Sequence, residues 1–359
     1  MHTILIDGDN LAKRAIMASA KSDLQSGVWT GGIYNTLTML RDLLAHPALS
    51  AGRIVAAWDD GVPAFRLKLV PEYRAERHKR PGTLTPEQKA RAYGQLPLIR
   101  EMFTTLGIIN VRYPRMEGDD LLGELVRRFA SGPDIPVVVS SDKDLLQLVS
   151  AGAWQLMLGG GELVNEANFM PHTGVTPDDY LLFKLLVGDT SDNIPGVDGV
   201  GEVRSAELVN GYRNAVGWNE DSVAEKLGLL VRWLEAQRDV RKLRKCEEAV
   251  IAQAAQLKRL IGAVDLSASF DRKYAGALTE TLAESPVVSR TAFLKFAVRH
   301  HLGAVLGRPD HFLRPFATAE AMRNKYAKPT SPPRPTTLAR RSTRVPGRPL
   351  ARRRGSAGS

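Results

Sequence analysis

Residues 137–144 read VVVSSDKD, a run of β-branched residues followed closely by two aspartates. The stretches TILID (3–7) and RIVAAWDD (53–60) have the same form, an apolar run that stops at acidic residues. Helical patterns lie between these stretches, at residues 30–45, 85–107 and 119–130. Continuous apolar strands that alternate with helices are typical of parallel sheets. We therefore predict an α/β fold with a mostly parallel central sheet flanked by helices.

The acidic residues of these stretches are expected to lie close together. In a parallel sheet the carboxyl ends of the strands meet at one edge, so side chains that follow the strands converge there. A further acidic group, MEGDDLL (116–122), follows a strand-like run at 108–113, and GDTSDNIPGVDGVG (188–201) adds two more candidates. The residues gathered in this way are Asp7, Asp59, Glu117, Asp119, Asp120, Asp142, Asp144, Asp189 and Asp192.

Crowded carboxylates repel one another unless cations lie near them. Oxygen donors without His or Cys favour Mg²⁺, with Mn²⁺ as a substitute, and the histidines lack the spacing of zinc ligands. Each motif alone has a second interpretation: Asp7 is equally suited to cap a helix, and acids at 117–120 suit a helix N-terminus. Because the motifs recur at strand ends and helix starts, we predict a divalent-metal site.

The basic charge of the chain is concentrated at its end. The 359 residues carry a net charge of +10, and residues 327–359 hold nine Lys/Arg and no acid, which leaves about +1 for the rest. This Pro/Arg/Ser-rich tail is predicted to be disordered. A contact with a polyanion and a merely solubilising extension are the two interpretations of the tail.

The remaining composition indicates an ordinary intracellular protein. An apolar share of 43% without a span-length apolar run argues against a membrane protein. The N-terminus lacks the pattern of a signal peptide, and the single cysteine, Cys246, cannot form an internal disulfide. We expect a cytoplasmic protein.

The chain is expected to have three parts: an α/β part at 1–170, a mostly helical part at 171–318 and the basic tail at 319–359. In the second part, a helix–loop–helix is predicted at about 176–210, with glycines in the short loop GVDGVG (196–201). Such glycines let backbone groups approach a phosphate, although the loop can also be an ordinary connector.

A basic stretch, FRLKLVPEYRAERHKRP (65–81), surrounds Tyr73 with Arg and Lys. A charge run of this kind is often a solvated face. Arginines beside an aromatic ring also suit a single-stranded nucleic acid, with the cation for phosphate and the ring for base stacking. Both interpretations remain open on composition alone.

In chain order, the motifs LIDGDN (5–10), WDDGVPAFR (58–66), PEYRAER (71–77), MEGDDLL, SSDKDLLQLV (140–149) and GDTSDNIPGVDGVG resemble the 5′-nuclease family. This family comprises flap endonucleases and the 5′→3′ exonuclease domain of bacterial DNA polymerase I. The resemblance covers roughly residues 3–210 and implies a PIN-like nuclease core, a helical arch near 61–100 and a helix–three-turn–helix. It also implies Mg²⁺-dependent cleavage of DNA near 5′ single-strand/duplex junctions in replication or repair.

The family's functional residues map onto this chain by motif. The resemblance implies a first metal group of Asp7, Asp59, Glu117, Asp119 and Asp120, and a second group of Asp142, Asp144, Asp189 and Asp192. It implies catalytic and DNA-contacting roles for Tyr73, Arg74 and Arg77, and further DNA contacts by Arg66, Gly196, Gly199, Gly201 and Arg204, with K⁺ at the glycine loop. Two positions depart from the family pattern, with Arg74 and Val203 where the family has Lys.

Three functions are compatible with these motifs. The leading hypothesis is an exonuclease and flap endonuclease acting on DNA with a 5′ flap, overhang or nick. A second is a related nuclease that removes RNA primers from RNA/DNA hybrids, and a third is a non-catalytic DNA-junction binder. We expect a monomer without a polymerase domain, similar to free-standing phage enzymes, that cooperates with a separate DNA polymerase.

Overall fold

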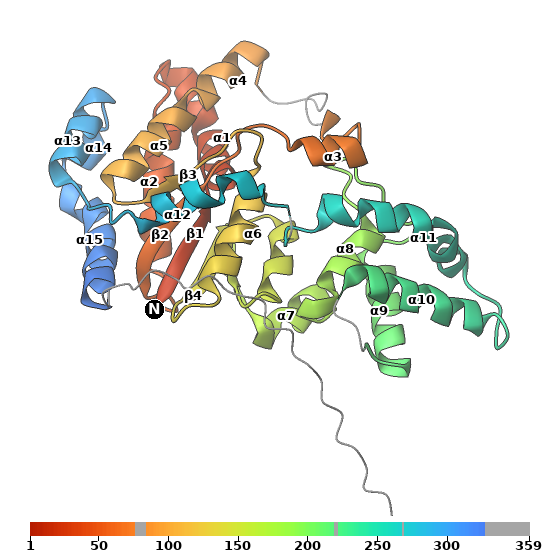
Figure 1. Cartoon of the computed structure of the whole chain (residues 1–359). Helices are drawn as coiled ribbons and strands as arrows, with labels where there is room; N and C mark the ends of the chain where they lie inside the picture. The colour runs from red at the N-terminus through yellow and green to blue at the C-terminus, as the bar shows by residue number, and fades with distance from the viewer. Residues whose placement is uncertain (76–83, 219–221, 268, 327–359) are drawn as a thin grey trace, which may run out of the picture. The chain divides into compact units, whose positions relative to one another are not determined.

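The computed structural model describes residues 1–75, 84–218, 222–267 and 269–326 (Figure 1). Met1–Lys325 form one compact unit. A central sheet lies within it, with strands in the order β3-β2-β1-β4-β5-β6. The strands are β1 (His2–Asp7), β2 (Ala51–Ala57), β3 (Ile109–Val111), β4 (Ile135–Ser140), β5 (Trp154–Met157) and β6 (Leu163–Val164). All neighbouring pairs are parallel except β5–β6, so the predicted fold class is confirmed.

Helices cover both faces of this sheet and continue beyond it. The helices of the first half are α1 (Gly8–Ser26), α2 (Gly31–Leu44), α3 (Ala64–Leu69), α4 (Pro86–Tyr93), α5 (Gln95–Thr105) and α6 (Gly118–Phe129). Those of the second half are α7 (Glu166–Thr173), α8 (Tyr180–Val187), α9 (Glu202–Ala215), α10 (Val223–Gln237), α11 (Lys245–Val264), α12 (Ala275–Ala283), α13 (Arg290–Arg299), α14 (Gly303–Leu306) and α15 (Pro309–Tyr326). The single helix expected at 85–107 is two helices, α4 and α5, which meet at Gly94.

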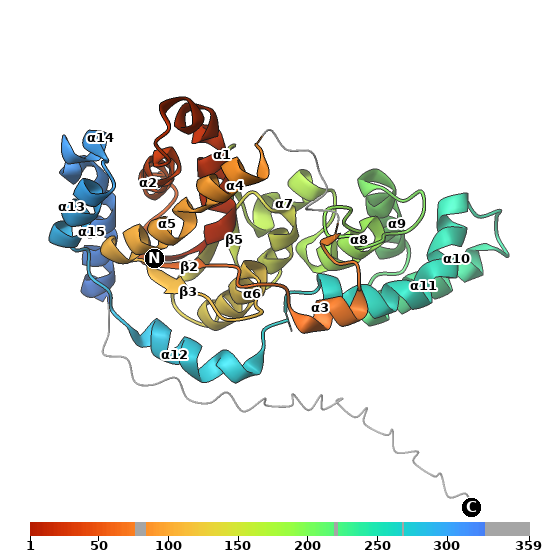
Figure 2. The ribbon, with the colours of Figure 1, turned by 90° about the horizontal axis from the view of Figure 1, so that it is seen from above.

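Side chains alternate between the two faces of the central strands, as the strand period requires. Ile4 and Ile6 of β1 point into a core with α1, α2 and α5, whereas Leu5 points into a second core with α6 and α12. Figure 2 shows α6 and α12 on the side of the sheet away from α1 and α2. Both faces are therefore buried, which explains the continuous apolar runs in the sequence.

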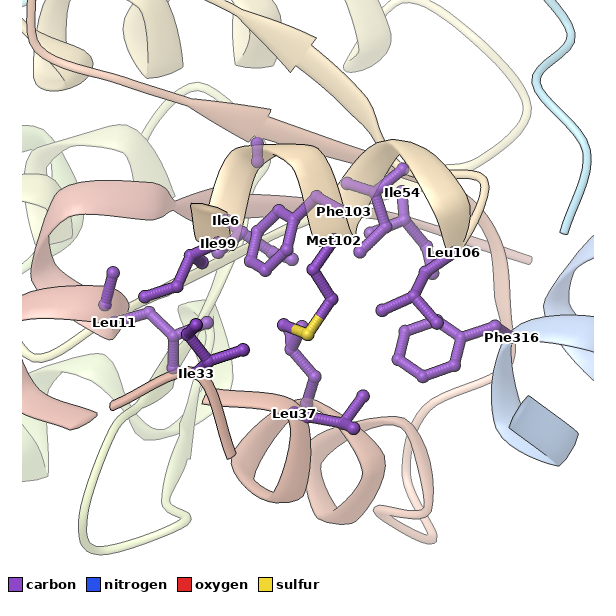
Figure 3. Packing of buried hydrophobic residues seen from close by; sticks show 14 of the residues in the cluster. Ile6, Leu11, Ile33, Leu37, Ile54, Ile99, Met102, Phe103, Leu106 and Phe316 are labelled. Atoms are coloured by element: carbon purple, nitrogen blue, oxygen red, sulfur yellow. The ribbon is translucent and has the colours of Figure 1, made fainter. Parts of the chain in front are cut away.

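The helical region predicted at 171–318 does not form one separate domain. Helices α8 to α11 build a third core of their own. The last helices return to the sheet, where Phe316 of α15 packs in the same core as Phe103 of α5 (Figure 3). Phe293 of α13 belongs to this core as well. A backbone bridge between Leu106 and Val288 fixes this return.

Helical structure also extends past the boundary expected at residue 319. Helix α15 continues to Tyr326, because Ala319 is buried against the first core. The predicted tail at 327–359 lies outside the described residues. Among the described helices, none is both long enough and apolar enough to span a membrane.

Candidate active site

The carboxyl edge of the sheet brings the first acids together. Asp7 ends β1 and caps α1, accepting a hydrogen bond from the Asn10 backbone N–H (3.0 Å). It also accepts a hydrogen bond from the Ser140 hydroxyl at the end of the neighbouring strand β4 (2.8 Å). Asp59, just beyond β2, accepts the Gly118 backbone N–H at the start of α6 (2.8 Å). Strand ends and a helix N-terminus thus position both carboxylates at one edge.

Asp120 is an ion-pair partner in the core, and it shares Arg66 with Glu117. The Arg66 guanidinium donates to both of its oxygens, at 2.9 and 2.7 Å, and the Asp120 side chain is fully buried. One oxygen also accepts the Glu117 backbone N–H. Both oxygens of Asp120 are thus engaged by protein donors in this structure, and its role as a metal ligand stays a prediction.

Arg66 is likewise not a DNA contact in this structure. Its guanidinium pairs with Glu117 and Asp120 and donates from Nε to the Ala263 carbonyl at the end of α11 (3.1 Å). Its side chain is 3% exposed, so a phosphate outside cannot reach it. The basic stretch therefore contains one buried structural arginine, which ties α3 to α6 and α11.

Tyr73 is also buried, which excludes the predicted stacking of a base on its ring in this conformation. Its ring packs in the core of the helical region, and its hydroxyl donates to Asp192 (2.9 Å) and Glu117 (3.2 Å). Arg74 follows with a left-handed backbone (φ 59°) and forms ion pairs with Glu117 and, at 3.4 Å, with Asp192. The predicted residue Arg77 lies outside the described residues.

The second acidic group lies on the loops after β4 and α8. The Asp144 backbone N–H donates to the Asp142 side chain (2.9 Å), and the Asp144 carboxylate pairs with Lys184 of α8 (2.6 Å). The Asp189 side chain accepts backbone N–H groups from Ser191 (2.6 Å) and from the next residue. Although burial alone would raise the pKa of Asp189, these hydrogen bonds lower it.

A pocket joins members of the two groups. It encloses about 390 Å³, including its open mouth. Its walls are formed by Arg66, Tyr73, Asp119, Asp144, Lys184, Gly188, Asp189, Asp192, Ile194, Ala263, Val264 and Leu266. Four acids from three separate sequence motifs therefore line one space.

Burial and mutual repulsion disfavour the ionised forms of these acids. Burial raises the pKa of Asp7 to about 7, and the Asp59 and Asp142 carboxylates add to this shift. Burial also raises the pKa of Asp119 well above its usual value, with the same neighbours and Asp7 contributing. The pKa of Asp144 rises to about 6 through burial, although Lys184 opposes the shift. Asp142 of the second group thus contributes to the raised pKa values of Asp7 and Asp119 in the first group.

The acids do not form a preassembled metal-ligand shell. Within the described parts of the chain, no three His, Cys, Asp or Glu side chains converge closely enough to hold one ion. Cations of the protein contact them instead: Arg74 at Glu117, Lys184 at Asp144 and, at 3.6 Å, Lys13 at Asp59. The assignment of the remaining acids to two metal groups stays a prediction.

Sequence reasoning missed Lys184, although it had a signal. Helix α8 reads YLLFKLLV, with one lysine in an otherwise apolar helix. A lone cation in such a position requires a partner or a path to solvent. The acids at 142–144 were the candidates for that partner.

The glycine loop has the expected helix–loop–helix setting, between α8 and α9. Gly196 packs so tightly that an added Cβ would lie 2.1 Å from the Val187 carbonyl oxygen. Gly199 has a left-handed backbone (φ 73°), and its carbonyl accepts a hydrogen bond from Arg204 (2.6 Å). Gly201 caps α9, so the predicted residues lie together, while their contact with DNA stays a prediction.

Comparison with known proteins is consistent with this arrangement. Residues 2–174 match the family described as 5′-3′ exonuclease, N-terminal resolvase-like domain. A 5′-3′ exonuclease of Bacillus subtilis is 34% identical over 235 residues, covering 63% of this chain and 74% of that protein. A DNA polymerase I of Mycobacterium tuberculosis is 35% identical over 240 residues, covering 64% of this chain but only 25% of the polymerase.

Solved structures agree on the fold. A T5 5′-exonuclease with bound divalent metal ions (zinc) superposes with a TM-score of 0.58 at 20% identity, covering 84% of this chain and 99% of that chain. The T5 D15 protein co-crystallized with metal ions gives a TM-score of 0.56 at 19% identity, with the same coverage.

The relatives and the fold together define the chain as a nuclease, an enzyme rather than a non-catalytic binder. It belongs to the 5′-nuclease family, which confirms the resemblance read from the motifs.

Proposed function

We propose that the protein is a divalent-metal-dependent 5′ nuclease that hydrolyses DNA next to 5′ ends and 5′ flaps. The observation that carries this proposal is the pocket lined by Asp119, Asp144, Asp189 and Asp192 at the carboxyl edge of the sheet. The substrate class follows from the relatives named 5′-3′ exonucleases. A T5 flap endonuclease of the same fold has been solved with DNA and metal ions (TM-score 0.56, 18% identity), which supports the flap substrate.

The donor set suits a hard divalent ion. All the pocket's acids offer carboxylate oxygens. Burial, with added repulsion between the carboxylates, raises the pKa of Asp7 and Asp119, and a cation that enters offsets both effects. We propose that Asp7, Asp59, Glu117 and Asp119 hold one ion and that Asp142, Asp144, Asp189 and Asp192 hold a second. Bound divalent ions would activate water and neutralise charge on the scissile phosphate.

The chain's own residues prepare this site. Hydrogen bonds from Ser140 and Gly118 orient the carboxylates of Asp7 and Asp59, so these oxygens are preorganised for a ligand. Lys184 and Arg74 offset the carboxylate charge before an ion is present. The Arg74 side chain is 15% exposed, and we propose that it exchanges its ion pairs with the acids for a DNA phosphate.

The glycine loop extends the proposal to the duplex part of the substrate. Gly199 and Gly201 precede α9, whose N-terminal backbone N–H groups suit a phosphate. The Gly199 carbonyl is a candidate K⁺ ligand that Arg204 now engages. Replacing K⁺ by tetramethylammonium in duplex-binding assays measures this contribution.

A labelled 5′-flap DNA tests the proposal directly. The protein is expected to cut it in Mg²⁺ or Mn²⁺ and not in EDTA. Asp142→Ala is expected to abolish cleavage but to retain flap binding, because it removes an ion ligand and leaves less negative charge near DNA. Asp134→Ala, at the opposite end of the same strand, is the matched control and should cut normally. Parallel loss of binding and cleavage in Asp142→Ala would contradict the ligand assignment.

An RNA-primed strand in the same assay distinguishes DNA cleavage from primer removal. Equal rates on both substrates would widen the proposed substrate class to RNA/DNA hybrids. A monomeric state, a cytoplasmic location and cooperation with a separate polymerase stay predictions of the sequence.

A further inference from the structure

The net positive charge of residues 1–326 lies in the last helices, α13 to α15. Residues 289–326 carry seven Lys/Arg and only two Asp/Glu. Residues 327–359 add nine more, so residues 1–288 have a net charge of about −4. The nuclease motifs thus belong to the acidic part of the chain, and helices α13 to α15 form a separate basic part. Such segregation marks a contact surface for a polyanion.

The start of α15 presents this charge. His311 and Arg314 are spaced by three residues on the helix, which places them on one side of it, and Arg308 directly precedes its first residue. All three are exposed, while Phe312 and Leu313 between them are buried in the core. Within the described parts of the chain, the guanidinium groups of Arg308 and Arg314 have no hydrogen-bond or ion-pair partner. Their charge is therefore available to a ligand.

Arg41 of α2 completes a basic hollow against α15. The hollow has a volume of about 810 Å³, including its open side, and is lined by Arg41, Asp42, Ala45, His311, Arg314 and Pro315. The Arg41 guanidinium lies 2.7 Å from the His311 ring nitrogen and 5.6 Å from the Phe312 ring centre, so it is held in place. Asp42 neutralises part of the Arg41 charge, and Arg314 supplies a second guanidinium.

This patch lies at the edge of the sheet opposite the carboxylates. Arg41 is near the end of α2, which leads into the start of β2, whereas Asp59 follows the end of that strand. Strand β2 has seven residues, or about 23 Å at about 3.3 Å each. A ligand that reaches both places must extend along the molecule, as a duplex arm does.

We infer that Arg41, Arg308, His311 and Arg314, here called the α2–α15 patch, bind the sugar–phosphate backbone of duplex DNA away from the cleavage site. Guanidinium groups match phosphate oxygens in charge and in fork geometry. The patch has no exposed large apolar side chain between Arg308 and Arg314 that would enter a bilayer. This inference rests on the proposed DNA substrate and assigns it a second contact.

The test is binding by the full chain in EDTA, which keeps it independent of cleavage. Fluorescence anisotropy compares flap DNA with duplex arms of 8 and 30 base pairs for wild type and Arg308→Gln/Arg314→Gln. We expect the variant to bind the long-arm DNA about fivefold more weakly at low salt, and to lower the slope of log K against log salt by about 1–2. Binding of the short-arm DNA should be unchanged.

The matched control is Arg272→Gln/Lys273→Gln, which removes the same charge next to α12 on the other side of the sheet. It should leave both affinities near wild type. Equal losses in the two variants, or an unchanged long-arm affinity in the patch variant, would overturn the inference. So would a loss of binding to phosphatidylglycerol vesicles with DNA binding unaffected, because the patch would then serve a membrane. Flap cleavage in Mg²⁺ separately tests the proposed function.

Discussion

Arg66 and Asp120 form a bidentate ion pair inside the core, with side chains 3% and 0% exposed. Within the acidic group at 117–120, Arg66 neutralises Asp120 and also pairs with Glu117, so two of the three carboxylates have a protein cation beside them. Burying two charges is unfavourable unless their hydrogen bonds are complete. Here Arg66 also bonds Glu117 and the Ala263 carbonyl, which completes them.

Asn substitutions at positions 119 and 120 should separate the two acids. Asp119→Asn should abolish Mg²⁺ binding and cleavage without lowering the melting temperature, because it relieves repulsion. Asp120→Asn should retain Mg²⁺ binding but lower the free energy of unfolding by about 3 kcal/mol, since it leaves Arg66 partly uncompensated. Thermal unfolding and Mn²⁺ titration of both variants measure this. Loss of ion binding in folded Asp120→Asn would return Asp120 to the ligand set.

Arg74 is expected to matter for the rate of cleavage. Arg74→Ala should slow single-turnover cleavage more than tenfold, which corresponds to about 1.4 kcal/mol in the barrier. Arg74→Lys should recover much of the rate because lysine keeps the positive charge. The recovery should be incomplete because lysine lacks the planar guanidinium group. Rapid-quench assays on a flap substrate give the rates. An unchanged rate in Arg74→Ala would limit this arginine to its ion pairs with Glu117 and Asp192.

Lys184 should act as a competitor of the metal ion at Asp144. Lys184→Met removes the cation that offsets this carboxylate in the absence of metal. We expect a lower melting temperature in EDTA and a larger rise on adding Mg²⁺ than in wild type, because binding to the native state stabilises it. Calorimetric melts with and without Mg²⁺ test this. An equal rise in melting temperature on adding Mg²⁺ in both proteins would show that Lys184 does not compete with the ion at Asp144.

The stability of the helical region should depend on pH through Glu247. Hydrogen bonds from the Arg241 guanidinium and the Arg244 backbone lower its pKa from 4.5 to about 2. Because folding lowers this pKa, the stabilisation is present above pH 4.5 and is lost as the pH falls toward 2. Glu247→Gln should cost about 1–2 kcal/mol at pH 7, less than the shift alone gives, since solvent screens the half-exposed arginines.

Urea unfolding at pH 7 and pH 3 measures this difference. The neighbouring Glu248→Gln, which removes an exposed pair with Arg238, is the control and should change stability by less than about 0.5 kcal/mol at either pH. The same penalty for Glu247→Gln at both pH values would contradict the assignment.

The basic tail is predicted to add affinity without directing the cut. Truncation at Ala327 should weaken duplex binding at low salt and flatten the salt slope by a few units, since each neutralised phosphate contributes about 0.9. The cleavage position and thermal stability should stay the same, because the pocket and the cores lie upstream. Salt titrations and a cleavage map on one flap substrate test both statements. A shifted cut would give the tail a role in placing the substrate.

The sequence predicted the sheet and its acidic edge because both depend on local patterns. Apolar runs that stop at Asp7, Asp59 and Asp142 define strands and their ends without knowledge of distant contacts. The capping box of Thr85 and Gln88 at the start of α4 is another feature that depends on neighbouring residues alone.

The features that were missed depend on partners far apart in the chain. Arg66 looked like one member of a basic run, but its partner Asp120 lies in another element, and a charge run does not show which member is buried. Tyr73 is buried for the same reason, since the core around it comes from α8 to α11. The return of α13 to the sheet depends on Phe293, which packs in the first core. The apolar pattern of this segment indicates a helix, but it does not show against which surface the helix packs.

The bridge between Leu106 and Val288 has a consequence for synthesis of the protein. The core over the first face of the sheet contains Leu37 and Phe103 from the first third of the chain and Phe316 from α15. A nascent chain therefore leaves the ribosome with this face uncovered until α15 has emerged. Contacts of such long sequence separation form late and slow folding, and the exposed face favours aggregation meanwhile.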